Sequence, residues 1–454
     1  MSRIADYIGV SARENVEKAL AKARENENFN AILSLSEERA FDRAAKVDSG
    51  EITGRLAGVP FIAKDNFLTF GGTTTAASKL LENFEAPIQA TAIEKLEAEG
   101  AICIGKANLD AFAHGGSTEN SAFGPTKNAL DQERVAGGSS GGSAVVVALD
   151  IVPFTLGTDT GGSIRQPASF NGVVGVKPTY GTVSRYGVVA MASSTDTIGV
   201  LSATAEDAEI VMDILSGRDR KDMTTLPDFF EPKALSEPKR IGLIKDFMTD
   251  DVDSEVRARV GEYIEGLKAK GHTIEEVSLP MLKYALAIYY IVVPAEVSSN
   301  LGRYDGIRYG KRADAATLSE VYGLSRDQGF VSENKRRIMI GSYVLSSGFF
   351  DAYYMQAQKA RTLLINEFNK VFESFDALIG PVAPNPAFKL GENTEDPIKM
   401  YLADIMTVPA SLAGLPAISV PAGKTEAGLP VGVQLIGPRK ADAILLALAR
   451  QGEV

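Results

Sequence analysis

Two loops rich in glycine and serine lie close together in the first half of the chain, and each adjoins an apolar run. The first reads GGSSGGSA over residues 137–144 and is followed directly by VVVAL. The second reads TDTGGSIR over residues 158–165 and follows the apolar run IVPFTL. Gly/Ser-rich segments are often flexible linkers, but a linker does not fit between two buried elements and then recur about twenty residues later. The pattern therefore favours loops that are built into a folded core.

The second loop has the composition of a site made from backbone groups. Glycines permit backbone conformations closed to other residues and let N–H groups approach a ligand closely. Loops that leave strand ends are also where open α/β sheets place their sites. The N–H groups of Gly161, Gly162 and Ser163 are therefore candidates for binding an oxyanion. Phosphate binding and a structural turn remain as alternatives, although neither loop matches GxxxxGK[ST] or GxGxxG.

A serine nucleophile in such a loop needs a base. The chain has only two histidines, His114 and His272, so a Ser-His-Asp triad would depend on one of them. His272 is predicted to be a surface turn residue, and His114 is a weak candidate for a place near the site. Lys64, which ends the apolar run VPFIA, is the stronger candidate, because desolvation lowers the pKa of a lysine. The alternative is a lysine whose ammonium reaches the surface beside Asp65.

Composition excludes several classes of protein. The 454 residues are 45% hydrophobic and carry 47 basic and 58 acidic side chains, a net charge of −11. An acidic chain is a poor non-specific binder of nucleic acid or anionic membrane. The single cysteine, Cys103, rules out an internal disulfide and a cysteine-based metal cluster, and we expect it to be a small core residue. Without a signal-peptide core or an apolar run of about 20 residues, the cytoplasm is the expected location.

Hydrophobic periodicity predicts helices that alternate with buried strands. The expected helices are 11–26, 37–47, 91–99, one opening at Val145, 252–271 and most of 335–375. The expected strands are 31–36, 59–63, 101–105, 152–156, 240–244, 377–381, 417–421 and 431–435. This alternation indicates one large α/β domain, residues 1–454, with a largely parallel or mixed sheet.

The loop GGSSGGSA, followed by GTDTGGSIRQPASFNGVVGVKPTYG, resembles the signature of the amidase signature family. The resemblance implies a mixed central sheet covered by helices on both faces, with a helical segment at 1–50 and the catalytic core at 56–200. It also implies a lysine, a serine that follows a cis peptide bond, and a serine nucleophile. These match Lys64, Ser139 and Ser163, whose separations of 75 and 24 residues fit the family pattern.

The same resemblance implies roles for the residues around the nucleophile. The backbone of Thr160, Gly161 and Gly162 would form the oxyanion hole. Asp159 and Arg165 are expected to brace the loop as an ion pair rather than to take part in the chemistry.

Four further stretches resemble the members of this family that work as the glutamine-hydrolysing component of a tRNA-dependent amidotransferase. They read FGPTKN, KPTYGTVSRYGVVAMASSTDTIG, SSNLGRYDGIRYG and RRIMIGSYVLSSGFFDAYY. The resemblance implies that a glutamyl-serine acyl-enzyme forms and that the released ammonia converts Glu-tRNA(Gln) to Gln-tRNA(Gln). It assigns ATP and Mg to a tRNA-binding partner, the B subunit of the amidotransferase, which is joined by the small C subunit. This chain itself would need no cofactor, metal or membrane.

Free glutamine carries a carboxylate and an ammonium, so its pocket needs an arginine and an acid. By resemblance these are Arg337 and Asp404, with Tyr289 or Tyr290 lining the site. Surface charges are the alternative for both ionic residues. The chain departs from the family in several places. SSTDTIGV over 193–200 stands where SSLDQIGP is common, His114 and Gly116 stand where methionine and serine are frequent, and the end after Gly437 is short. A stand-alone amidase for a small amide and a non-catalytic scaffold remain the alternative functions.

Overall fold

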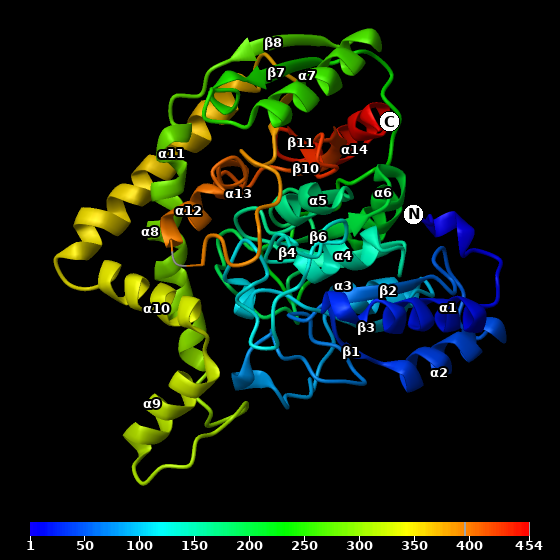
Figure 1. The fold of residues 1–454 in the computed structure, drawn as a ribbon, viewed down its shortest axis with the longest axis vertical. Helices are drawn as coiled ribbons and strands as arrows, with labels where there is room; N and C mark the ends of the chain where they lie inside the picture. Colours follow the sequence, from blue (N-terminus) through cyan, green and yellow to red (C-terminus); the bar gives the residue numbers. More distant parts are fainter. Residues whose placement is uncertain (395, 454) are drawn as a thin grey trace.

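A single mixed β-sheet runs through the computed structural model, which describes residues 1–394 and 396–453 (Figure 1). Its strands lie in the order β1 (Ile32–Leu35), β3 (Ile102–Ala107), β2 (Pro60–Lys64), β4 (Phe154–Asp159), β6 (Thr197–Ser202), β5 (Val174–Lys177), β10 (Ala417–Lys424), β11 (Pro430–Ile436), β9 (Ala377–Pro381), β7 (Arg240–Ile244) and β8 (Thr273–Val277). β2 pairs in parallel with β3 and β4, and β7 with β8 and β9. The pairs of β4 with β6 and of β10 with β11 are antiparallel.

Helices cover both faces of the sheet, and β2 shows why its sequence reads as an unbroken apolar run. Side chains of a strand alternate between the two faces. Ile62 packs with α1 (Ala12–Glu25), α2 (Glu37–Asp48) and α4 (Gly141–Ala148) on one face. Phe61 and Ala63 pack on the other, in the cluster that includes α3 (Thr91–Ala98) and α6 (Ala205–Leu215). The expected mixed sheet between helices is thus confirmed, and Lys64 is the last residue of this doubly covered strand.

A group of helices beside the sheet completes the molecule and holds much of the second half of the chain (Figure 1). The long helix α8 (Leu282–Asn300) packs against α10 (Ser332–Val344) and α11 (Met355–Val371), while α9 (Leu318–Gly329) projects from this group. Two short helices, α12 (Pro397–Leu402) and α13 (Val408–Leu412), lie between these helices and the sheet. Helices α5 (Arg165–Asn171), α7 (Ser254–Ala269) and α14 (Asp442–Gly452) pack against β10 and β11. In the described ranges, no helix combines the length and apolarity that a membrane span requires.

Three expectations from the sequence are wrong in detail. The helix expected to open at Val145 begins at Gly141, whose N–H donates to Thr118 Oγ1 at 3.1 Å. The strand expected at 152–156 is Phe154–Asp159, because Pro153 has no N–H for the ladder. His272 is buried rather than a surface turn residue, since Lys239 N–H donates to its Nδ1 and its Nε2 lies 2.7 Å from Gln451 Oε1.

Candidate active site

Lys64 lies at the buried end of β2 and makes four contacts with neighbouring polar atoms. Its Nζ lies 2.7 Å from Ser139 Oγ, 2.9 Å from both Ser140 Oγ and Thr158 Oγ1, and 3.4 Å from the Thr158 carbonyl oxygen. The side chain is fully buried, and this burial lowers its pKa to about 7. The carboxylates of Asp110, Asp159 and Asp196 offset the shift only in part. A large share of Lys64 is therefore neutral near pH 7 and able to accept a proton.

The neighbours of Lys64 fix the direction of its lone pair. Ser140 donates its own proton to the Thr158 carbonyl at 3.2 Å, so its Oγ is left to accept from Lys64. Thr158 Oγ1 receives a hydrogen bond from Asn66 Nδ2 at 3.1 Å and can accept one more from Lys64. When both N–H groups of a neutral amine are used in this way, its lone pair faces the remaining partner, Ser139 Oγ. Lys64 can then take the proton of Ser139.

The loop that carries Ser139 is held on both sides by side chains from elsewhere. The Gly138–Ser139 peptide bond is cis, as the resemblance implies. Thr118 donates to the Gly137 carbonyl at 2.7 Å, and Gly138 N–H donates to Gln166 Oε1 at 2.9 Å. Gly138 also has no room for a side chain, because a Cβ there would lie 2.2 Å from Asp110 Oδ2.

The second glycine loop lies directly against the first. Ser140 N–H donates to the Ser163 carbonyl at 3.1 Å, which joins the two loops through their backbones. Gly161 and Gly162 both lack space for a side chain: a Cβ would lie 2.7 Å from Tyr289 Oη at Gly161 and 2.2 Å from Thr407 Oγ1 at Gly162. In the described part of the chain, the N–H groups of these two glycines find no acceptor. They are free to donate to a developing oxyanion.

Arg165 and Asp159 form the expected ion pair below the nucleophile loop. The pair is fully buried, with Arg165 Nη2 2.9 Å from Asp159 Oδ1 and Nε 3.0 Å from Oδ2. Arg165 Nη1 and Nη2 also donate to the Thr407 carbonyl and to Ser411 Oγ, each at 2.8 Å. A buried charge is tolerated only when it is paired and hydrogen-bonded in this way. The pair braces the loop that carries Ser163.

Arg337 and Asp404 line a second polar region, a cavity of about 60 Å³. The buried Arg337 on α10 donates from Nε to Glu333 Oε1 at 2.7 Å, and its guanidinium lies 4.8 Å from the Tyr290 ring centre. Asp404 is partly buried, and among the described residues its carboxylate receives one hydrogen bond, from Gln166 Nε2 at 3.4 Å. Burial, opposed by Arg337, raises the pKa of Asp404 to about 8. The cavity thus presents a fixed cation and a titratable acid.

The structure brings the residues that the sequence singled out into two adjoining groups. Lys64 and Ser139 are in contact, and Arg337 and Asp404 face the same cavity. Gln166 joins the groups, because it bonds both Gly138 and Asp404. Tyr290 lines the cavity, whereas Tyr289 lies against Gly161.

Other side chains at the site were not identified from the sequence. Ser140 and Thr158 lie within the two glycine-rich loops, so the composition of these loops is the signal that could have identified them. Gln166, Glu333 and Tyr401 gave no comparable signal.

His114 does not line the cavity of Arg337 and Asp404. It is buried, with its Nδ1 2.7 Å from the Phe112 carbonyl oxygen, and burial lowers its pKa to about 3. An imidazole that stays neutral is unsuited to replace Lys64 as the group that holds a proton near pH 7.

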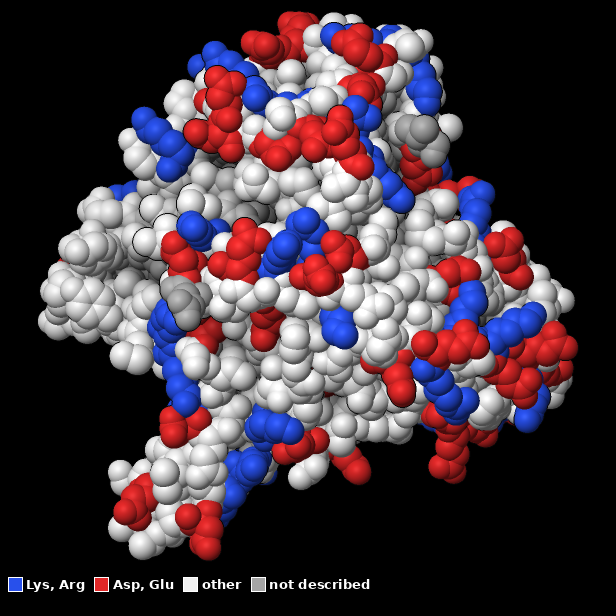
Figure 2. All heavy atoms as spheres, in the orientation of Figure 1, with Lys and Arg blue, Asp and Glu red and all other residues white. Residues whose placement is uncertain are grey.

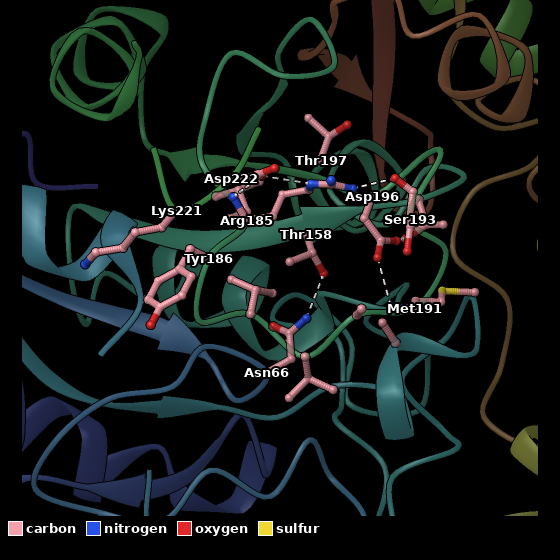
Figure 3. A pocket seen from close by; sticks show the side chains of 16 residues that line it. Asn66, Thr158, Arg185, Tyr186, Met191, Ser193, Asp196, Thr197, Lys221 and Asp222 are labelled. Carbon is pink, nitrogen blue, oxygen red and sulfur yellow. Dashed lines mark hydrogen bonds and ion pairs between the residues drawn. The ribbon is translucent and has the colours of Figure 1, made fainter. Parts of the chain in front are cut away.

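A separate pocket of about 220 Å³ is lined by Thr158, one of the hydrogen-bond partners of Lys64 (Figure 3). Asn66 and Thr158 lie on its inner wall, and Asp196 and Arg185 lie nearby. Asp196 accepts a hydrogen bond from Thr160 Oγ1 at 2.7 Å and so helps to hold the nucleophile loop. Over the described ranges, no cluster of three or more His, Cys, Asp or Glu side chains is arranged to hold a metal ion.

The chain is similar to known proteins over nearly its whole length. The amidase family model matches residues 14–446. The A subunit of glutamyl-tRNA(Gln) amidotransferase from Koribacter versatilis is 48% identical over 467 residues, covering 99% of this chain and 97% of that protein. The protein of the same name from Latilactobacillus sakei is 52% identical over 421 residues, covering 90% and 86% of the two chains.

Solved structures agree with these relatives. The crystal structure of the A subunit of glutamyl-tRNA(Gln) amidotransferase from Thermotoga maritima matches with a TM-score of 0.82 and 40% identity, covering 99% of this chain and 94% of that one. A bacterial aryl acylamidase, described as an amidase signature enzyme, matches with a TM-score of 0.85 and 26% identity, covering 99% and 95%.

Proposed function

Because the chain belongs to the amidase family, we propose that it hydrolyses the side-chain amide of glutamine and supplies ammonia for the conversion of Glu-tRNA(Gln) to Gln-tRNA(Gln). The observation that carries this proposal is the meeting of two groups. A buried, partly neutral Lys64 contacts Ser139, and Gln166 connects the Ser139 loop to the cavity of Arg337 and Asp404. A simple amide would use only the group that contains Lys64 and Ser139. The relatives named as the A subunit of the amidotransferase support glutamine as the substrate.

In the proposed mechanism, neutral Lys64 takes the proton of Ser139, which takes the proton of Ser163. Ser163 Oγ then forms a bond to the amide carbon of glutamine, and the carbonyl electron pair moves onto oxygen. The backbone N–H groups of Thr160, Gly161 and Gly162 are proposed to stabilise this oxyanion. When the carbonyl reforms, the C–N bond breaks and the relay returns its proton to the leaving nitrogen as ammonia. Water then attacks the glutamyl ester on Ser163 by the same relay, and glutamate is released.

The proposal predicts a pH profile set by Lys64. The base must be neutral, and its pKa is about 7, so kcat/KM should rise with pH and level off near pH 8. Below the pKa, the rate should fall about tenfold for each pH unit. A simple neutral amide such as acetamide is the substrate for this measurement. With glutamine as substrate, a second group would affect the profile. Asp404 has a pKa of about 8, so its carboxylate would become charged and bind the α-ammonium better as the pH rises. An acetamide profile that is flat from pH 6 to 8 would contradict the role of Lys64.

Replacement of Arg337 by alanine tests the recognition of glutamine. Arg337 is assigned to the α-carboxylate, so Arg337→Ala should raise KM for glutamine about 100-fold, as expected for a buried charge-assisted pair. The rate with acetamide should change much less, because acetamide has no α-carboxylate. Lys335→Ala is the control, since this cation on the same helix pairs with Asp327 and does not line the cavity. Equal losses on both substrates would assign Arg337 to the fold and favour a stand-alone amidase.

An exposed apolar surface supports the proposal that the chain works in an assembly. Side chains on α10, on the π-helical turn Phe350–Tyr354 and on α11 are exposed, and Figure 2 shows that the visible face of this protruding part is largely uncharged. They are Met339, Tyr343, Phe350, Tyr353, Met355 and Leu363. Patches of this kind mark protein interfaces. We propose that the tRNA-binding B subunit, which uses ATP and Mg, and the small C subunit join this chain in the cytoplasm.

The experiment that tests the whole proposal compares the single chain with the reconstituted three-subunit assembly. With glutamine, ATP and Glu-tRNA(Gln), the assembly should form Gln-tRNA(Gln) and the single chain should form none. The physical reason is that the chain is acidic, with a net charge of −11, and that its sequence contains no match to the phosphate-binding pattern GxxxxGK[ST]. Added ammonium chloride serves as the control for the partner's own activity. Full reaction by the single chain, or an assembly that uses ammonia but never glutamine, would contradict the assignment.

A further inference from the structure

The cavity of Arg337 and Asp404 is smaller than the substrate proposed for it. A volume of about 60 Å³ is about twice the roughly 30 Å³ that one water takes up in the liquid, which is too little for glutamine. Yet four of the residues that line it carry buried polar atoms that have no partner in the described part of the chain. These are Ser117 Oγ, Glu119 Oε2, Tyr290 Oη and Arg337 Nη1. Buried polar atoms are normally hydrogen-bonded, so the gathering of unpaired ones indicates a place for a polar ligand.

Tyr401, on the short helix α12, fills the missing space. Its ring stacks on that of Tyr290 with 3.9 Å between the ring centres, and the Arg337 guanidinium lies 5.2 Å from it. Its hydroxyl donates to Glu333 Oε1 at 3.1 Å, the same oxygen that accepts from Arg337 Nε. Tyr401 thus covers the cation assigned to the α-carboxylate.

The helix that carries Tyr401 is loosely held. None of the residues of α12 is buried, and the side chain of Ile398 is 69% exposed. Larger cavities lie on its other sides: one of about 740 Å³ is lined by Leu402 and Ile405, and one of about 580 Å³ by Lys399 and Leu402. A helix with few buried contacts and free volume beside it can shift at low cost. Tyr401 therefore has room to leave the cavity.

We propose that Tyr401 is a lid, which closes the cavity in the free protein and swings out with α12 to admit an amino acid. The inference rests on the proposed glutamine site and deepens it. A ligand with an α-carboxylate replaces the lost contacts of Tyr401 by binding Arg337 Nη1. A simple amide cannot make this contact, so it neither opens the lid nor needs to. The lid thereby lowers the affinity for amino-acid amides by the free energy of its opening and leaves other amides unaffected.

A single tryptophan on α12 tests the movement, because the chain contains no tryptophan of its own. Ile398→Trp is made in the Ser163→Ala background, which prevents turnover, and its fluorescence is followed as l-glutamine is added. The emission should shift at saturation and should not respond to acetamide. Leu318→Trp, at a 61% exposed position on the projecting α9, is the control and should not respond to either. Calorimetry on the same protein measures glutamine binding independently.

Tyr401→Phe tests the energetic role of the lid. It keeps the stacked ring but removes the hydrogen bond to Glu333, so the closed state is weakened and the Kd for glutamine should fall about fivefold, the net worth of one such bond. The rate with acetamide should stay the same. Glutamine binding without a shift at position 398, or weaker binding by Tyr401→Phe, overturns the lid alone. No glutamine binding by calorimetry overturns the glutamine site and the lid together.

Discussion

Ser163→Ala is expected to abolish amide hydrolysis while leaving the fold intact. The substitution removes the oxygen that is proposed to attack the amide carbon, and the neighbouring hydroxyl of the same loop, Thr160 Oγ1, is held by its hydrogen bond to Asp196 at 2.7 Å. Loss of a serine nucleophile lowers kcat by roughly 10⁴–10⁶-fold in enzymes that use a relay of this kind. Steady-state glutaminase activity is the measurement, with thermal unfolding followed by circular dichroism to show that the protein remains folded.

The chain offers a matched control for this experiment. Ser419 on β10 is also buried, and its hydroxyl has no partner among the described residues. Ser419→Ala removes the same atom from a buried position that no proposed step uses, so activity should be unchanged. A glutamine analogue that carries a diazoketone should label Ser163 covalently. Labelling at another residue, or full activity in Ser163→Ala, is incompatible with the mechanism.

Lys64→Ala should be nearly as damaging, with kcat reduced by roughly 10³–10⁵-fold. Without the amine, the proton of Ser139 has no acceptor, and the remaining catalysis depends on the oxyanion site. Lys64→Arg should be equally inactive although it keeps a cation, because a guanidinium does not give up its proton near neutral pH. The comparison of the two variants distinguishes the role of Lys64 as a base from a role as a positive charge.

Rescue by an added amine gives this prediction a second readout. Lys64→Ala leaves a buried space lined by the hydroxyls of Ser139, Ser140 and Thr158. A small primary amine such as propylamine should enter it and restore part of the rate, increasingly as the pH rises and the neutral amine becomes more abundant. Activity of Lys64→Arg close to that of the unsubstituted protein would exclude Lys64 as the base.

The sequence predicted the parts of the site that are local and missed those that are assembled from distant segments. The strand that ends in Lys64 could be read because both of its faces are buried, which makes its apolar run continuous. Ser139 and Ser163 could be read because glycines crowd around them. Glu333 and Tyr401, by contrast, are ordinary residues on amphipathic or exposed helices, and only the packing of α10 and α12 brings them to the same cavity.

The error at His272 has the same origin. A glycine before a strand predicts a turn, and a turn is normally at the surface. Here the C-terminal helix α14 covers the turn, because the side chain of Gln451 reaches His272. The hydrophobic periodicity near residue 272 carries no information about a contact with a residue 179 positions away in the sequence.

The partners of Arg165 set the time at which a newly made chain can become active. Its guanidinium is held by the Thr407 carbonyl, by Ser411 and, at 3.1 Å, by Gln434 Oε1, all from the last part of the chain. Thr407 also donates to the Gly161 carbonyl at 2.7 Å and lies against Gly162. While these residues are still inside the ribosome, the loop that bears Ser163 lacks its supports, even though the residues proposed for the relay have already emerged. The loop that bears Ser163 can therefore gain all of these supports only after Gln434 has left the ribosome.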